Sequence, residues 1–317
     1  MTRLLQKYGL LIIGIVIGIA YGLVTRLVFG ERATLASITY LFIFPTILGI
    51  FPLMFADNDQ LKSYKNIIFI PWLTVATYFL TMFLVGIEEF ICLLILAGPF
   101  FILGTIGAFI YRLVKINKKK NKGKILTLIF IPFLFAPIEE YIKSPSATFK
   151  IESDVIISAK PGTIWNNIVE VKTIQENEYN SGFFNDIGIP RPIRATVDRK
   201  EIGGQRIGSF EGGLKFVETI TQYEPKKIIS FDITVDPKSV RPNVFDQHVL
   251  NGNYFTFVDA TYELTPLSNG QVNLKLSSNY QLTSTINFYG KFWGDIILKD
   301  FQDRLLYVIE KRCETEE

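Results

Sequence analysis

The chain has 317 residues, more than the roughly 100–200 residues of a typical single domain, and its formal net charge is only +3. Hydrophobic residues make up 49% of the sequence and are concentrated before about Ser144, whereas charged residues recur every few positions after it. The later part shows no basic stripe with interleaved aromatics, so we exclude nucleic-acid binding. We therefore expect a transmembrane helical domain over residues 1–143 and a separate soluble domain over residues 148–317. The two cysteines, Cys92 and Cys313, fall in different domains, so no disulfide framework is implied.

Apolar runs in the first part of the chain predict an all-α transmembrane bundle of four to five helices. A helix of about 20 apolar residues crosses the hydrocarbon core of a bilayer. Four runs are long enough: Leu5 to Phe29, Leu35 to Ala56, Ile67 to Gly86 and Phe90 to Val114. No small-residue cleavage site follows the first run, so we interpret it as a retained helix. A fifth run, Ile125 to Ile138, is shorter and contains Pro132 and Pro137.

The placement of lysine and arginine predicts the topology of this multi-pass bundle in the cell membrane. Seven basic residues crowd between Arg112 and Lys124, and such cationic loops are retained in the cytoplasm. Four crossings before this loop put the N-terminus in the cytoplasm as well. The run Ile125 to Ile138 then decides the side of the soluble domain. A crossing, which we favour, places the domain on the outer face, and a re-entrant segment leaves it in the cytosol.

Two glutamate pairs, Glu88-Glu89 and Glu139-Glu140, lie at the ends of predicted segments, where water is within reach. We interpret them as interfacial end-markers rather than as intramembrane functional residues. A glutamyl intramembrane protease would need an arginine one turn after such a pair and histidines on neighbouring helices. The sequence has neither feature, because its single histidine is His248. It also shows no intramembrane charge pathway, which argues against an ion-coupled transporter.

Short alternating runs bounded by turn residues begin at Phe149 and are typical of β-strands. A strand over 149–159 and a short helix opened by Pro161 come first. Further strands are predicted near 193–199, 205–211, 214–223, 228–235, 254–264 and 271–282, and a long amphipathic helix over 286–311 ends the chain. This order is that of an α+β helix-grip domain.

Three stretches of this domain resemble START-like proteins of the polyketide cyclase/dehydrase type, in the SRPBCC superfamily. VIISAKPGTIWNNIVEV resembles their opening, GGLKFVETITQYEPKKIISFDI their central hairpin and NYFTFVDATYELTPLSNGQVNLKLSSNYQLT their last two strands. The resemblance covers roughly Phe149 to Arg312 and concerns architecture rather than catalytic residues. It implies a curved antiparallel sheet wrapped around the long C-terminal helix, which leaves a cavity that in relatives holds lipids, sterols, polyketides or other hydrophobic ligands. We recognise no family for the membrane part.

Strand alternation suggests which side chains line such a cavity. Glu218 shares a strand face with Phe216, so it would either orient a ligand's polar group or pair with a lysine or arginine at an edge. The ordinary alternative for the apolar residues is that they only fill the core. The predicted ligand-binding residues are Phe216, Glu218, Phe231, Ile233, Tyr254, Tyr262, Leu276, Tyr280, Phe288 and Phe292.

Catalytic signatures are absent from the sequence. His248, in the loop DQHVLNG, is a conceivable general base, but no nucleophile or partner carboxylate can be placed beside it. No phosphate loop or metal-spaced Cys/His cluster is present. We therefore assign no catalytic residue, metal or cofactor.

Three function classes remain after these exclusions. The preferred one is a membrane-anchored protein that binds or transfers a hydrophobic small molecule or lipid, because tethering gives a poorly soluble ligand a short path from the bilayer. The second is a cyclase- or hydrolase-type enzyme that acts on a hydrophobic substrate. The third is a sensor in which the ligand biases the helix bundle.

Overall fold

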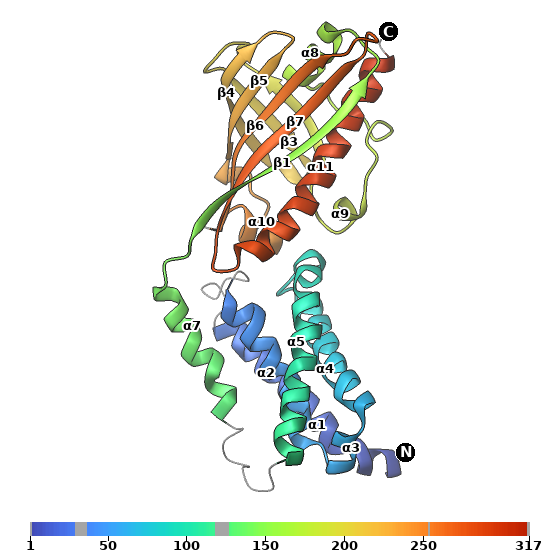
Figure 1. Ribbon diagram of the computed structural model, residues 1–317, viewed down its shortest axis with the longest axis vertical. Coiled ribbons are helices and arrows are strands. Elements are labelled where there is room, and N and C mark those ends of the chain that lie inside the picture. Colours follow the sequence, from blue (N-terminus) through green and yellow to red (C-terminus); the bar gives the residue numbers. More distant parts are fainter. Residues whose placement is uncertain (1, 29–36, 118–126, 253, 316–317) are drawn as a thin grey trace. The chain divides into compact units, whose positions relative to one another are not determined.

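A computed structural model describes residues 2–28, 37–117, 127–252 and 254–315 (Figure 1). The chain divides into two compact units. The helical unit comprises residues 1–144 with 284–286, and the C-terminal unit comprises residues 145–283 with 287–317.

The regular secondary structure among the described residues of the helical unit is helical. The helices are α1 (Thr2–Val28), the π-helix η1 (Thr39–Ile43), α2 (Phe44–Ile50), the 3-10 helix η2 (Phe51–Phe55), α3 (Asn58–Lys62), α4 (Tyr64–Leu84), α5 (Phe90–Asn117), the 3-10 helix η3 (Thr127–Phe130) and α7 (Ile131–Tyr141). Three described helices are long and apolar enough to cross a membrane, over Gly9–Val28, Tyr64–Leu84 and Phe90–Ile116. These three are consistent with a membrane protein.

The prediction of four uniform long spans is not confirmed. Leu35 to Ala56 contains a shorter apolar helix, Thr39–Phe55, built from consecutive π, α and 3-10 segments. Pro45 and Pro52 open its α and 3-10 parts, where the missing backbone donor interrupts a regular helix. The fifth run contains only a 3-10 turn and the 11-residue α7. The lysines of the predicted cytoplasmic loop from Lys118 to Lys124 lie outside the described residues.

Small residues let α2 and α5 approach closely. A Cβ added at Gly49 would come within 2.0 Å of the carbonyl oxygen of Gly104, and one at Gly107 within 2.0 Å of that of Thr46. Such small-residue contacts are typical of membrane helices, where close packing replaces the hydrophobic drive for association. Phe44 and Phe100 are fully buried in this unit, with their ring centroids 5.6 Å apart.

The C-terminal unit is a seven-stranded antiparallel sheet with the strand order β1-β7-β6-β5-β4-β3-β2. The strands are β1 (Ser146–Ile157), β2 (Pro192–Val197), β3 (Gln205–Phe210), β4 (Lys215–Glu224), β5 (Ile228–Val235), β6 (Phe255–Pro266) and β7 (Val272–Thr283). The first and last strands along the chain, β1 and β7, therefore lie side by side and pair antiparallel, although more than a hundred residues separate them.

Helices complete this unit: α8 (Pro161–Val169), the single-turn α9 (Phe183–Asp186), α10 (Val244–Val249) and the long α11 (Asn287–Thr315). α11 runs diagonally along the sheet (Figure 1). Its C-terminal part buries Leu306, Ile309 and Cys313 in a core shared with strands β1, β5, β6 and β7 and with α8. The architecture is a helix grip, so the fold predicted for this part of the chain is confirmed.

A bulge in β6 changes which of its side chains face the core. The register between β6 and β7 shifts between Phe257 and Asp259, and an extra residue in one strand reverses the alternation beyond it. Val258 is 37% exposed, whereas Ala260 and Tyr262 are buried. Residues on the two sides of the bulge therefore do not follow a single alternation.

Candidate functional site

A mostly apolar cavity of about 90 Å³ lies in the C-terminal unit, which leaves room for several water-sized groups. Its wall is formed by residues of β2 to β7, of α11 and of the segment after α8. Its apolar lining includes Phe210, Phe216, Phe231, Ile233, Phe257, Leu276, Leu298, Phe301 and Leu305. Its polar lining comprises Arg194, Arg206, Ser209, Glu218, Tyr262, Ser278 and Gln302.

The central polar feature of the cavity is an ion pair between Arg206 and Glu218. The two residues are direct partners of the antiparallel strands β3 and β4, and Nη1 of Arg206 donates to Oε2 of Glu218. They are only 5% and 8% exposed. The guanidinium also lies over the ring of Phe231, 5.0 Å from its centroid. Each charge thus offsets the cost of burying the other.

Tyr262 adds a neutral hydroxyl beside this pair. Burial raises the pKa of Tyr262 to about 12, although the positive charge of Arg206 opposes the shift. Burial by itself would lower the pKa of Arg206, but the neighbouring Glu218 carboxylate outweighs it, so this pKa lies above its ordinary value. At neutral pH the cavity therefore contains a charged guanidinium and a protonated phenol.

Two buried polar atoms at the cavity wall have no hydrogen-bond partner among the described residues: Nε of Arg206 and Oε1 of Gln302. Gln302 is 2% exposed, and its Nε2 donates to Oγ of Ser278 at 2.9 Å. An unpaired buried polar group costs about 1–3 kcal/mol. Both residues line the cavity, so its wall includes two side chains whose hydrogen-bonding capacity the described residues do not fill.

Comparison with known proteins identifies no family for the chain: no family model and no curated protein matches it. Among solved structures it is similar to a protein from Nitrosospira multiformis, with 13% identity over 53% of this chain and 100% of that one and a TM-score of 0.33. Truncated norcoclaurine synthase from Thalictrum flavum has 12% identity over 54% and 96% of the two chains and a TM-score of 0.34. A protein of unknown function from Enterococcus faecalis has 16% identity over 52% and 70%, with a TM-score of 0.31.

The structure brings six of the ten predicted ligand-binding residues together at the cavity wall. They are Phe216, Glu218, Phe231, Ile233, Tyr262 and Leu276. Of the two roles considered for Glu218, the structure shows pairing with an arginine, but in the interior rather than at an edge. Contact of these six residues with a ligand stays a prediction.

The other four predicted residues lie elsewhere. Tyr254 precedes β6 on the far side of the bulge, which breaks the alternation that placed it with Tyr262. Tyr280 shares the inner face of β7 but lies beyond the cavity, where its hydroxyl donates to Oδ1 of Asp295 at 2.6 Å. Phe288 and Phe292 are 66% and 55% exposed. They are not among the residues that line this cavity, and their contact with a ligand stays a prediction.

Arg206 and Gln302 were missed by sequence reasoning although they supply the cavity's unpaired polar atoms. Arg206 follows the turn at Gly203-Gly204 and looks like an ordinary solvent-facing residue of a hairpin. Its pairing with Glu218 depends on the register across the next turn, η4 (Glu211–Gly213). The one signal of this pairing in the sequence was the position of Arg206 and Glu218 on either side of the turn.

His248 lies on α10 and is not among the cavity-lining residues. Its sequence neighbour Asp246 is buried and accepts two hydrogen bonds from Arg241, both at 2.7 Å. The carboxylate nearest in sequence is thus bound by an arginine. Nothing in the geometry of the C-terminal unit assigns the histidine a catalytic role in this cavity.

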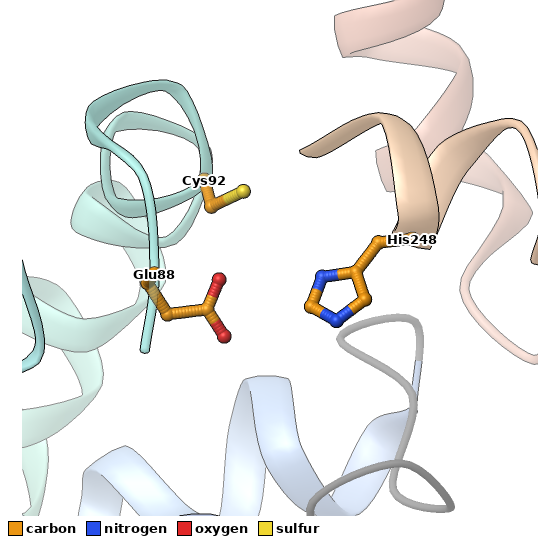
Figure 2. A group of neighbouring side chains, drawn as sticks. All are labelled: Glu88, Cys92 and His248. Atoms are coloured by element: carbon orange, nitrogen blue, oxygen red, sulfur yellow. The ribbon is translucent and has the colours of Figure 1, made fainter. Parts of the chain in front are cut away.

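The interpretation of Glu88 as an interfacial end-marker is wrong. Glu88 is 1% exposed, and Oε1 accepts hydrogen bonds from Nε and Nη2 of Arg26 at 2.9 and 2.7 Å. Arg26 lies near the end of the first apolar span and Glu88 precedes α5, so the ion pair links two segments of the helical unit. Figure 2 shows that the side chains of Glu88 and Cys92 project to the same side. His248, which is also drawn there, belongs to the C-terminal unit.

Glu139 also has a structural contact that the end-marker interpretation did not include. Its carboxylate accepts hydrogen bonds from the backbone N–H groups of Ile38 and Thr39 at 2.6 and 2.9 Å. Those groups belong to the start of η1, where a helix leaves N–H groups without internal partners. Glu139 therefore caps a helix within the helical unit.

Proposed function

We propose that this chain is a membrane-anchored protein that binds a small hydrophobic molecule in the cavity of its C-terminal unit. The observation that carries the proposal is a mostly apolar cavity whose lining includes Arg206 and Gln302, two side chains with a buried polar atom, Nε and Oε1, that has no partner among the described residues. An apolar cavity with a few placed polar groups is the usual form of a small-molecule site.

The residues that line the cavity indicate the chemical class of the ligand. Its body is apolar, because aromatic and aliphatic side chains form most of the lining. It carries polar groups that accept a hydrogen bond from Arg206 and donate one to Gln302, as hydroxyl or amide groups can. The volume of about 90 Å³ favours a compact molecule over a two-chain lipid.

Membrane anchoring supports this proposal through the supply of ligand. Three apolar helices are long enough to hold the chain in a bilayer, and only the four residues from Ile142 to Pro145 join the end of α7 to the start of β1. A ligand that dissolves poorly in water is concentrated in that bilayer. We propose a multi-pass protein of the cell membrane with a cytoplasmic N-terminus and the C-terminal unit on the outer face.

A second candidate function, a cyclase- or hydrolase-type enzyme, is favoured by the convergence of Arg206, Glu218 and Tyr262 on the same cavity. A phenol that stays protonated at neutral pH can donate a proton or a hydrogen bond to a substrate oxygen. Replacing Tyr262 with phenylalanine separates the two candidates. If the chain is a binding protein, the variant should retain the ligand as wild type does. If it is an enzyme, the variant should still bind the substrate but no longer convert it.

The proposal is tested by native mass spectrometry of the full chain purified in nanodiscs, followed by extraction of the bound molecule. Wild type should retain a small hydrophobic molecule in defined stoichiometry. Ala260→Val places two methyl groups at the cavity wall and should reduce its retention, because Ala260 is a lining residue. Ala159→Val is the matched control, since Ala159 is buried in the core but does not line the cavity.

Two outcomes would contradict the proposal. One is a wild-type protein that retains nothing beyond the lipids of the nanodisc. The other is equal loss of the molecule from both alanine variants, which would mean that overpacking of the domain, and not the filled cavity, removes it. Thermal melting of each variant shows whether the domain has kept its fold.

A further inference from the structure

The first turns of α11 present an apolar face to solvent. Phe288, Phe292 and Ile296 are 66%, 55% and 39% exposed. Their spacing of four residues places them on one side of the helix, one above the other. A row of exposed aromatic and aliphatic side chains indicates a contact surface, whereas single exposed apolar residues do not.

Glycines on the opposite side of α11 explain this orientation. A Cβ added at Gly290 would come within 2.9 Å of Leu282, and one at Gly294 within 3.0 Å of the Tyr280 hydroxyl. The glycine side therefore lies directly against β7. Positions 288 and 292 are two residues away from these glycines, about 200° around the helix, so their side chains point away from the sheet.

The chain itself indicates what covers this face. α11 begins at Asn287, and the preceding residues, Ser284 to Ile286, group with the helical unit rather than with the sheet. Phe288 therefore follows, two residues along the chain, a segment that belongs to the helical unit. The helical unit holds the three apolar helices. A helix next to a membrane segment with phenylalanine on its exposed apolar face is typical of helices that lie in the lipid interface.

We propose that the first turns of α11 lie in the interface of the lipid bilayer and that Phe288, Phe292 and Ile296 insert among the lipids. The inference rests on the membrane insertion proposed above for the helical unit. Lys291, which pairs with Asp295 one turn along the helix, keeps its charge at the headgroup level while its stem covers apolar surface. The same helix carries Gln302 at the cavity wall, so contact with lipid and the binding cavity share one rigid element.

The test places one fluorescent probe at a time on the full chain in nanodiscs of phosphatidylcholine and phosphatidylglycerol. Single cysteines are introduced by Phe288→Cys and Phe292→Cys and labelled with a polarity-sensitive dye. Both side chains are exposed, so these changes remove no core packing. The native Cys92 and Cys313 are buried, and the wild-type protein serves as the labelling blank. Lipids with a spin label near the headgroup then quench probes that lie in the interface.

Probes at 288 and 292 should lose fluorescence with the spin-labelled lipid and emit at shorter wavelength than a probe at Asp303→Cys, an exposed site further along α11. Ile202→Cys is the matched control for an exposed apolar residue, because Ile202 is 67% exposed in the β2–β3 hairpin. Equal quenching at 288, 292, 202 and 303 would overturn the inference. A probe at Ile102→Cys in α5, with a lipid spin-labelled in the acyl chain, separates the two proposals. If the probe at 102 is unquenched as well as those at 288 and 292, the helical unit does not lie in the membrane, and the inference fails with that proposal.

Discussion

Arg206 and Glu218 face each other across β3 and β4, and their ion pair is buried beneath a cavity whose other walls are mainly apolar. A buried pair of this kind adds little net stability, because the cost of removing both charges from water offsets most of their attraction. Apolar residues of similar volume would stabilise the fold as well or better. The pair is therefore better explained by what it presents to the cavity than by stability.

Glu218→Leu should destabilise the C-terminal unit by about 3–5 kcal/mol, because it leaves the Arg206 guanidinium buried without a counter-charge. The double variant Arg206→Met/Glu218→Leu removes both charges and should recover most of that loss. Thermal unfolding of the full-length protein, followed by circular dichroism of the sheet, measures both. A double variant as unstable as the single one would show that the pair is essential for the fold. In that case its role in ligand binding would lose its main support.

Gln302→Leu should lower ligand retention with little loss of stability. The change removes the unpaired Oε1, which stabilises the fold, and the hydrogen bond from Nε2 to Ser278, which destabilises it. Each effect is about 1 kcal/mol, so the two nearly cancel. Native mass spectrometry of the nanodisc-embedded protein measures retention. Gln222→Leu on β4, outside the cavity, should keep the ligand. Unchanged retention in the Gln302 variant would contradict the assignment of this side chain.

The elements of the C-terminal unit could be predicted because strand alternation and turn residues act over short distances. β5 begins and ends at Ile228 and Val235, as the sequence pattern indicated. The run from Leu35 to Ala56 was less predictable, since hydropathy measures how apolar a segment is and not whether its helix is continuous. Pro45 and Pro52 carry that information, and each opens a new helical segment.

The candidate site was predictable only where a strand keeps its alternation. Phe231 and Ile233 are consecutive inward positions of β5, and both reach the cavity. Phe257 was missed because the bulge at Val258 lies between it and Tyr262, and no local pattern marks a bulge. The partner of Glu88 lies 62 residues away. A contact at that distance depends on helix packing, which local sequence does not encode.

Glu88→Gln should destabilise the helical unit, since it leaves Arg26 in a buried position without a full negative charge. We expect a lower melting temperature for the detergent-solubilised full chain, measured by heating followed by size-exclusion chromatography. Glu89→Gln is the matched control, because Glu89 is less buried. The charge-exchanged variant Arg26→Glu/Glu88→Arg should melt above Glu88→Gln. If Glu88→Gln melts like wild type, the pair contributes nothing to the bundle.

The contact between Glu178 and Arg312 predicts a pH-dependent contribution to stability. Nε and Nη2 of Arg312, in the last turns of α11, donate to the two carboxylate oxygens of Glu178, both at 2.8 Å. These hydrogen bonds lower the pKa of Glu178 below its ordinary value, and burial opposes the shift only in part. An acid whose pKa is lower in the folded state stabilises the fold above its unfolded pKa, about 4.3 for glutamate. The contribution is lost as the pH falls through the folded pKa.

Glu178→Gln should therefore melt below wild type at pH 7, by the equivalent of about 1–2 kcal/mol for a paired and partly buried carboxylate. The difference should stay constant down to about pH 5 and shrink towards zero below about pH 4, because wild-type Glu178 then becomes protonated and resembles the amide. Thermal unfolding between pH 7 and pH 3 measures it. Glu176→Gln, exposed on the same loop, should show a smaller difference at pH 7. A difference for Glu178→Gln that persists unchanged to pH 3 would mean that the carboxylate charge does not stabilise the contact with α11.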